Sequence, residues 1–345
     1  MTEELIKSRK NDHIRINLEE NVRSNLNNGL EQYRFIHNAL PEIDLSEVDL
    51  TQKIFNKIVA LPILISSMTG GTPEAFQINQ MLAQAAEKFG LAMGVGSQRA
   101  AIENHTLIGT FNVRKFAPNI LLFANLGAVQ LNYGYGIAEC KRAVEMIEAD
   151  SLILHLNPLQ EAVQPEGDTN FSGLLKKIEI ISHELPVPVV VKEVGWGISD
   201  ELAKQLINAG VAAIDVSGAG GTSWSQVERF RLTDPIGIKV SEAFLDWGIP
   251  TADALVKIRS RFPDYPIFAS GGLKTGMDVA KSLALGANLA GMAGIFLKAA
   301  VVSLDQLVET ISVFERIIRI SMFATGSKDL ISFSNGKIFK SGEQA

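Results

Sequence analysis

The chain has 345 residues, of which 46% are hydrophobic, and 32 Lys and Arg stand against 38 Asp and Glu. This hydrophobic share can build a large core, which excludes a disordered chain, and the net charge of −6 excludes a nucleic-acid binder that works through overall charge. A single cysteine, Cys140, excludes a disulfide framework and a cysteine-rich zinc site. The first ten residues lack the apolar stretch of a signal peptide, and no apolar run is long enough to cross a bilayer. We therefore expect a cytoplasmic protein with no membrane or nucleic-acid partner.

Residues 1–60 are polar and only weakly periodic, so we expect them to form an extension that packs on the main domain. Eight short apolar runs follow, and their lack of clean alternation is typical of parallel strands covered on both faces. The predicted strands are Pro62–Ser67, Ala92–Gly96, Ile120–Asn125, Ser151–Asn157, Pro188–Glu193, Ala212–Ser217, Pro266–Ser270 and Asn288–Ala293. Helical spacing of apolar residues predicts helices between them over Glu74–Phe89, Ile137–Glu148, Phe171–Glu184, Asp200–Ala209, Thr251–Phe262 and Met277–Leu285.

Eight strand–helix units span about 260 residues, close to the roughly 250 residues of a (β/α)8 TIM barrel. A doubly wound open sheet is disfavoured because no G-x-G-x-x-G motif opens the first helix. The predicted fold is thus an α/β TIM barrel over residues 61–325, with an N-terminal extension over 1–60 and a C-terminal tail over 326–345. A turn signal at Asn335-Gly336 makes that tail either a short hairpin or a frayed end.

Glycine-rich turns follow the last strands, at the end of a TIM barrel where active sites lie. Gly271-Gly272 follows the seventh strand and Ala293-Gly294 the eighth, which is where barrels present backbone amides to a phosphate. The loop Gly218–Thr222 after the sixth strand can add amide donors. One such turn alone would only reverse the chain, but three neighbouring ones predict a phosphorylated ligand.

Lys192 ends an apolar strand, where an ammonium is costly unless it meets a negative charge. It can serve as a Schiff-base lysine or as a cation against a cofactor ring that becomes negative. An exposed lysine, or one paired with Glu193, is the structural alternative.

A second group of residues can bind another anion. Cationic and amide donors are supplied by Arg9, Lys10, His13, Arg99, His155, Asn157 and Gln160, and they suit a diphosphate. Glu161 is a ligand of the kind that Mg²⁺ uses together with substrate phosphates. Trp224 and Glu228, one helical turn apart, can stabilise a cation and relay a proton. Each also has a structural alternative, such as a packing Trp or a solvated charge pair.

Nine short sequence segments carry a family resemblance along the chain from Arg9 to about Thr325: RKNDHI, PILISSMTGG, GVGSQR, NLGAVQL, HLNPLQE, VKEVGWGIS, DVSGAGGTSW, SGGLKTGMDVAKSLALGA and AGMAG. Together they resemble type 2 isopentenyl diphosphate isomerase, an FMN-dependent family. HLNPLQE and the RKxxH opening are the discriminating pieces, whereas SGG and AGMAG are shared more widely among FMN-binding barrels. The resemblance implies the redox-neutral conversion of isopentenyl diphosphate to dimethylallyl diphosphate, with Mg²⁺ and with NADPH or NADH to reduce the flavin. It also suggests a homo-oligomer, a tetramer or octamer.

The resemblance also implies roles for individual residues. FMN would be held by Ser67, Met68, Thr69, Ser97, Asn125, Lys192, Ser217, Thr222, Gly271, Gly272, Ala293 and Gly294. The substrate would be bound by Arg9, Lys10, Ser97, Gln98, Arg99, His155, Asn157 and Gln160, with Glu161 holding Mg²⁺. The catalytic candidates are Lys192, Trp224, Glu228, Gln160 and His155, and FMN itself would serve as acid and base.

Three other functions fit parts of the sequence less well. An FMN-dependent oxidoreductase acting on a small anionic substrate usually needs a His base near strands six to seven, and the segment Ser217–Arg231 contains none. A nucleotide reductase needs a cysteine on a strand-end loop, whereas Cys140 lies within a predicted helix. A sensor of a phosphorylated ligand would not need Lys192 and Glu161 beside the glycine turns.

Overall fold

The computed structural model describes the backbone of residues 3–342 and the side chains of residue 10 and residues 12–342. Eight parallel strands close into a barrel in sequence order, with the last strand beside the first. They are β4 (Ile63–Ile65), β5 (Ala92–Gly94), β6 (Leu122–Gly127), β7 (Ser151–His155), β8 (Val189–Lys192), β9 (Ala213–Asp215), β10 (Ile267–Ser270) and β11 (Leu289–Met292). Each predicted strand overlaps one of them, and β6 runs two residues past its predicted end at Asn125, so the TIM-barrel prediction is confirmed.

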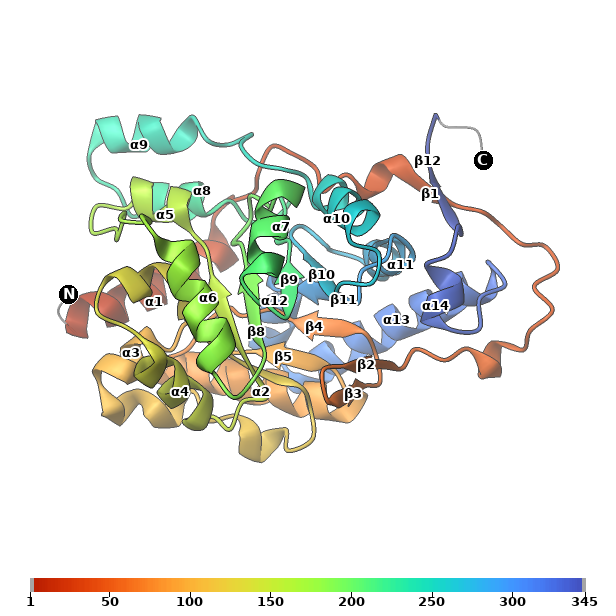
Figure 1. Cartoon of the computed structure of the whole chain (residues 1–345), viewed down its shortest axis with the longest axis horizontal. Helices are drawn as coiled ribbons and strands as arrows, with labels where there is room; N and C mark the ends of the chain where they lie inside the picture. The colour runs from red at the N-terminus through yellow and green to blue at the C-terminus, as the bar shows by residue number, and fades with distance from the viewer. Residues whose placement is uncertain (1–2, 343–345) are drawn as a thin grey trace.

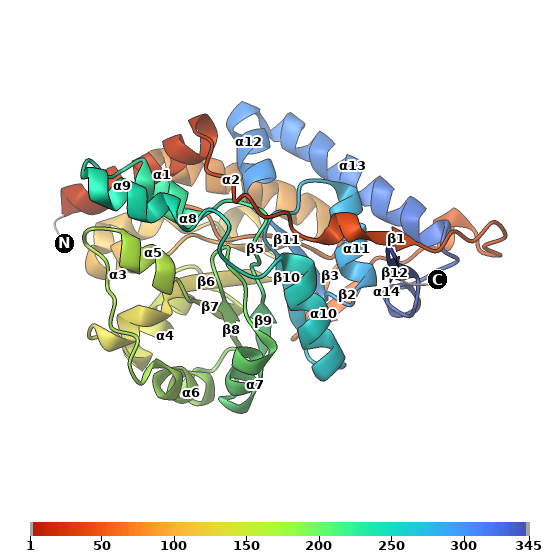
Figure 2. The ribbon, with the colours of Figure 1, turned by 90° about the horizontal axis from the view of Figure 1, so that it is seen from above.

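Helices surround the barrel and cover its outer face (Figures 1 and 2). Those that follow the strands are α2 (Pro73–Phe89), α3 (Arg99–Glu103), α4 (Ile137–Glu145), α5 (Pro158–Val163), α6 (Leu174–Glu184), α7 (Asp200–Asn208), α8 (Trp224–Arg229), α9 (Pro235–Glu242), α10 (Thr251–Arg261), α11 (Gly276–Ala284), α12 (Gly294–Val302) and α13 (Leu304–Phe323). The six predicted helices are present with small shifts at their ends. Local chemistry sets several of these ends: the Thr72 hydroxyl accepts from Ala75 N at the start of α2, and Gly90 ends that helix with φ of +63°.

The barrel interior is apolar in the part away from the C-terminal ends of the strands. Phe123 and Phe268 meet there with ring centroids 6.0 Å apart in an edge-on arrangement. A hairpin of β2 (Gln52–Ile54) and β3 (Lys57–Val59) adds Ile54 and Val59 to the same cluster. This apolar filling stops below the C-terminal ends of the strands, where the side chains become polar.

The N-terminal extension contains a helix that the weak periodicity did not predict. Helix α1 (Glu3–Glu19) packs against α8 at the mouth of the barrel. Its sequence has no broad apolar stripe, although Ile16 is fully buried. Polar contacts to the barrel rim, described below, hold it in place.

Over its described residues, 326–342, the C-terminal tail forms neither a hairpin nor a frayed end, so both alternatives were wrong there. The chain leaves α14 (Leu330–Phe333), turns at Gly336 and enters β12 (Ile338–Lys340), which pairs antiparallel with β1 (Tyr33–Phe35) of the N-terminal extension. Phe333 stacks on Phe35 with centroids 5.5 Å apart. The partner strand lies about 300 residues away in sequence, which a local turn signal does not reveal. No helix of the described chain is long and apolar enough to cross a membrane.

Candidate active site

A cavity of about 410 Å³ opens at the C-terminal ends of the barrel strands. Its floor and walls come from strand ends and the loops after them, and Lys10, His13 and Asn17 of α1 line it as well. The volume lies within the range of small-molecule sites. The predicted site residues that line it are Lys10, Ser67, Met68, Thr69, Ser97, Arg99, Asn125, His155, Asn157, Gln160, Glu161, Lys192, Ser217, Thr222, Trp224, Gly271, Gly272, Ala293 and Gly294.

One predicted residue has a side chain that is not described, and two others are placed differently from the expectation. The Arg9 side chain lies outside the described residues. Gln98 is fully buried, and its amide donates to Ala143 O at 2.8 Å and accepts from Asn125 N at 2.9 Å. Both ends of this amide are therefore used in joining α4 to β6, which corrects the expectation that it contacts substrate. Glu228 is also fully buried and reaches the cavity only through residues that line it.

One end of the cavity is a backbone cradle. Gly271 and Gly272 have φ of +107° and +75°, a region that favours glycine. A Cβ on Gly271 would lie 2.1 Å from Gly218 O, and one on Gly272 would lie 2.4 Å from the Gly220 carbonyl group, so side chains are excluded at both positions. Helix α12 begins beside them at Gly294 without a side-chain cap, which leaves its first amides available. This arrangement fits a phosphate group.

The floor of the cavity carries a row of ionisable residues. The strand register pairs His155 of β7 with Lys192 of β8, and Lys192 with Asp215 of β9. The Lys192 ammonium donates to Glu193 O at 2.6 Å. Burial lowers the pKa of Lys192, while the charges of Asp215 and Glu193 oppose that shift. Asp215 was missed by the sequence analysis, although its charge within the apolar run Ala212–Ser217 is the same signal that identified Lys192.

The Glu193 side chain accepts hydrogen bonds from backbone amides of the loop that follows it. Its carboxylate accepts from Gly195 N at 2.7 Å, Trp196 N at 2.5 Å and Gly197 N at 3.1 Å. Burial raises the pKa of Glu193 to about 7, and these hydrogen bonds limit the rise. Its carboxylate therefore shapes the loop after β8, with its hydrogen bonds directed into the backbone.

The cavity also offers polar groups to a ligand such as the ring system of FMN. The hydroxyls of Ser66 and Ser67 are buried without a hydrogen-bond partner among the described residues, and both side chains line the cavity. Buried polar atoms without partners are rare and costly, so they indicate a missing ligand group. Together with the phosphate cradle, they show that the residues present fit FMN.

The wall formed by β5 to β7 carries the second set of donors. His155 Nδ1 lies 2.8 Å from Asn125 Oδ1, which fixes the ring. Arg99 is held by Glu103 at 2.8 Å and by Asp168 at 2.7 Å. Its guanidinium thus has a fixed place on the rim.

Glu161 faces the same wall. Its carboxylate accepts from Asn157 Nδ2 at 2.8 Å, Gln164 Nε2 at 2.5 Å and Asp168 N at 2.7 Å. Asn157 Oδ1 is buried with no hydrogen-bond partner among the described residues. No cluster of three or more His, Cys, Asp or Glu within the described part of the chain could hold a metal alone. Any cation here would need oxygen ligands from substrate as well.

Helix α1 lies over the cavity, where Lys10 and His13 contact the barrel rim. Lys10 Nζ donates to Gly70 O at 2.6 Å and to Ser97 O at 3.2 Å, and lies 4.8 Å from the centre of the Phe111 ring. Further along the helix, the His13 ring meets Trp224 edge-on with centroids 5.0 Å apart.

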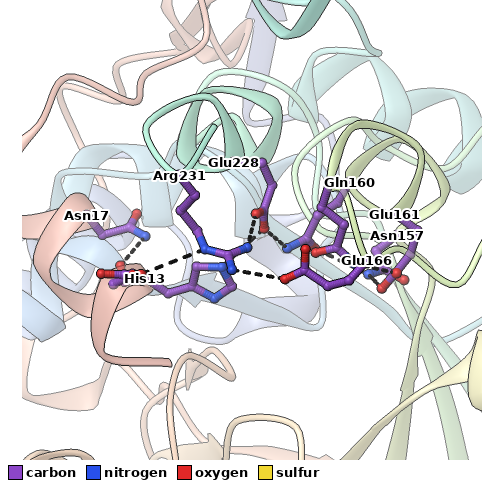
Figure 3. Close-up of polar contacts among 10 residues, drawn as sticks. His13, Asn17, Asn157, Gln160, Glu161, Glu166, Glu228 and Arg231 are labelled. Atoms are coloured by element: carbon purple, nitrogen blue, oxygen red, sulfur yellow. Dashed lines mark hydrogen bonds and ion pairs between the residues drawn. The ribbon is translucent and has the colours of Figure 1, made fainter. Parts of the chain in front are cut away.

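A buried charge network joins α1 to the wall of the site (Figure 3). Glu228 accepts from His13 Nε2 at 3.1 Å and from Gln160 Nε2 at 2.9 Å. Arg231 donates to Glu228 at 2.5 Å and to Glu166 at 3.0 Å. Although burial favours the protonated form, the contacts with His13, Gln160 and Arg231 lower the pKa of Glu228 to about 2. The carboxylate is therefore charged at neutral pH and orients two residues that line the cavity.

Comparison with known proteins agrees with this architecture. Residues 154–339 match the model of the FMN-dependent dehydrogenase family. Among solved structures, a chimeric (S)-mandelate dehydrogenase superposes with a TM-score of 0.69 at 17% identity, covering 98% of each chain. A mandelate oxidase gives a TM-score of 0.68 at 18% identity, covering 97% of this chain and 99% of its own. These distant likenesses support the fold.

Curated relatives are much more similar in sequence. The isopentenyl-diphosphate delta-isomerase of Nostoc sp. is 54% identical over 324 residues, covering 94% of this chain and 93% of the relative. The protein of the same name from Rickettsia bellii is 50% identical over 330 residues, covering 96% of each chain. The chain belongs to the isopentenyl-diphosphate delta-isomerase family, built on the barrel of the FMN-dependent dehydrogenases.

Proposed function

We propose that this protein converts isopentenyl diphosphate to dimethylallyl diphosphate with FMN bound in the cavity. The observation that carries the proposal is one cavity with two different anion sites. The glycine cradle and the start of α12 serve one phosphate, and the rim of Lys10, Arg99 and the β7 residues serves another anionic group. Two phosphorylated molecules can therefore bind in the same cavity, as a diphosphate isomerase with a flavin requires.

The FMN phosphate would be held by Gly271, Gly272, Ala293 and Gly294. The ring and its side chain would contact the floor and walls, at Ser67, Met68, Thr69, Ser97, Asn125, Lys192, Ser217 and Thr222, all of which line the cavity. When bound and reduced, FMN supplies an electron-rich ring that stabilises a nearby cation and a ring nitrogen that can exchange a proton. The Lys192 ammonium balances negative charge at the floor.

The substrate diphosphate would bind at the rim. Lys10, Arg99 and His155 offer cationic or ring N–H donors, and Asn157 and Gln160 offer amides. Ser97 adds a hydroxyl, and Arg9 would approach from the same helix as Lys10. Glu161 would hold Mg²⁺ together with diphosphate oxygens, since its carboxylate lines the cavity beside these donors.

The reaction moves one proton onto the terminal alkene carbon and removes another from the carbon on the far side of the double bond. No electrons are gained or lost by the substrate, and a tertiary cation lies between the two proton transfers. Trp224 lines the cavity and can face that cation. Gln160 is held by Glu228, so its amide has one orientation, and His13 on the same carboxylate can pass protons to the rim.

The reductant, location and assembly follow the family resemblance. NADPH or NADH would reduce FMN before turnover, and the protein would act in the cytoplasm as a homo-oligomer of four or eight chains.

The alternative is an FMN-dependent oxidoreductase on the same barrel, which the match to the dehydrogenase family model favours. The test is anaerobic incubation of the protein with FMN, NADPH, Mg²⁺ and isopentenyl diphosphate, with product and reductant both measured. We expect many turnovers for each NADPH consumed. Equal amounts of product and oxidised NADPH would instead support the oxidoreductase, and a protein that does not retain FMN would contradict both.

A further inference from the structure

Asp215 is a buried carboxylate to which the proposed reaction gives no task. Its exposed fraction is 0%, at the end of β9 beneath the cavity floor. One oxygen, Oδ1, accepts from Ser270 Oγ at 2.7 Å and from Ser217 N at 3.3 Å. The other, Oδ2, is buried with no hydrogen-bond partner among the described residues. A half-satisfied buried carboxylate is costly and needs a reason.

The strand register places Asp215 next to Lys192. Residues paired across neighbouring parallel strands point to the same face of the sheet, about 4.8 Å apart along the hydrogen-bonding direction. Lys192 and Asp215 are such a pair, and Lys192 lines the cavity, so both side chains project into the barrel. Among the described residues the Lys192 ammonium donates to Glu193 O and forms no direct ion pair with Asp215. The two charges still attract each other through a medium of low dielectric constant, which raises the pKa of Lys192 and lowers that of Asp215 against the opposite effects of burial.

The other titratable groups around Lys192 are less able to compensate its charge. Glu193, the next residue in the chain, is bonded by three backbone amides, and its charge raises the pKa of Lys192 less than that of Asp215 does. His155, on the other neighbouring strand, is bonded to Asn125. A buried lysine without a counter-charge loses its proton. Asp215 has a buried carboxylate oxygen, Oδ2, with no hydrogen-bond partner among the described residues.

We infer that Asp215 is a positioning residue that keeps the Lys192 ammonium charged at the floor of the FMN site. This rests on the proposed function, since it assigns Lys192 its role beside the reduced flavin. Asp215 itself touches neither FMN nor substrate in this account and acts through Lys192 alone. The Ser270 hydroxyl and the Ser217 amide hold the carboxylate in place.

The decisive measurement is the reduction potential of FMN bound to the Asp215→Asn holoenzyme. Simple removal of a negative charge near the flavin would raise the potential, because reduction adds negative charge. If Asp215 instead sustains the Lys192 charge, the change to Asn removes the carboxylate charge and Lys192 then loses its proton. The reduction potential falls as a result, and the affinity of the protein for reduced FMN drops about tenfold relative to its affinity for oxidised FMN. A rise in potential would overturn the inference. Ser270→Ala, which removes a hydrogen bond to Asp215 but keeps the charge, is the control and should shift the potential much less.

The same Asp215→Asn change in a Lys192→Arg variant tests whether the effect passes through the lysine. Arg stays protonated without a counter-charge, so in Lys192→Arg the further change Asp215→Asn should no longer lower the potential. The same fall in potential with Arg present as with Lys would contradict the inference, since the effect would then not pass through the lysine proton.

A readout on the unchanged protein covers the case in which Asp215→Asn does not fold. In enzyme labelled with ¹³C at lysine Cε, the Lys192 signal, assigned by its loss in Lys192→Arg, should have the chemical shift of an ammonium at neutral pH. The shift of a neutral amine would refute the inference. Wild-type protein that fails to retain FMN or to isomerise isopentenyl diphosphate would refute the proposed function, whereas normal activity with a neutral Lys192 would refute only the assignment of Asp215.

Discussion

Removing the charge of Glu228 should destabilise the protein strongly at neutral pH and much less in acid. The carboxylate is fully buried and is bonded by His13, Gln160 and Arg231. Its pKa of about 2, against a usual value of 4.5, corresponds to about 3 kcal/mol of folding free energy at pH 7. Glu228→Gln should remove a contribution of that size, since glutamine has no charge to offer Arg231.

The pH dependence follows from the direction of the shift. Because the folded pKa lies below the unfolded one, the contribution is complete above about pH 4.5 and is lost as the pH falls towards 2. Urea unfolding of wild type and Glu228→Gln at pH 7 and at successively lower pH should show a difference that shrinks below pH 4.5. Equal stabilities at pH 7, or a difference that stays constant in acid, would refute the reasoning.

A matched control lies on the same part of the fold. Glu242 pairs with Arg229 at 2.8 Å, but its side chain is 44% exposed. Exposed pairs contribute little, so Glu242→Gln should change the stability by less than about 1 kcal/mol. A loss as large as that of Glu228→Gln would mean that burial of the network is not what makes it strong.

Three further predictions concern the cavity. Glu161→Gln should raise the Mg²⁺ concentration needed for half-maximal activity while leaving FMN affinity unchanged, and an unaltered Mg²⁺ dependence would contradict its role. Gly272→Ala should weaken FMN binding by tenfold or more, measured by fluorescence titration, because its Cβ would meet backbone at 2.4 Å; Gly336→Ala, with similar φ of +69° but open space around it, is the control. The double change Lys192→Met with Asp215→Leu should leave stability unchanged or raise it by about 1–4 kcal/mol while abolishing activity, and a large loss of stability would show that the pair is structural.

Much of the fold could be predicted because its signals are local. Each barrel strand is an apolar run of a few residues, and the glycine turns after β10 and β11 stand in sequence where the structure uses them. Helix α1 could not be predicted in this way. It is fixed to the barrel by polar contacts such as Lys10 to Gly70 O, and its sequence has no apolar stripe that would reveal it. The pairing of β12 with β1 depends on an edge strand far away in sequence, which no local pattern contains.

The site shows the same limit at the level of single side chains. Gln98 is polar and stands beside a predicted substrate residue, yet its amide is consumed by Ala143 O and Asn125 N, a fact that only the packing of α4 on β6 reveals. Asp215 is the opposite case, because one oxygen is left without a partner. Sequence shows which residues carry charge, whereas the register of neighbouring strands decides which charges face each other.

The same register explains why a stable barrel retains charges in its interior. Phe268, the register partner of Asp215, meets Phe123 in the apolar cluster of the barrel interior, so apolar side chains and buried charges are neighbours there. Replacing buried charges with apolar side chains of the same volume is often neutral or stabilising. Lys192 and Asp215 are therefore explained better by a ligand that gains negative charge above them than by a contribution to stability. The proposed flavin chemistry supplies such a ligand.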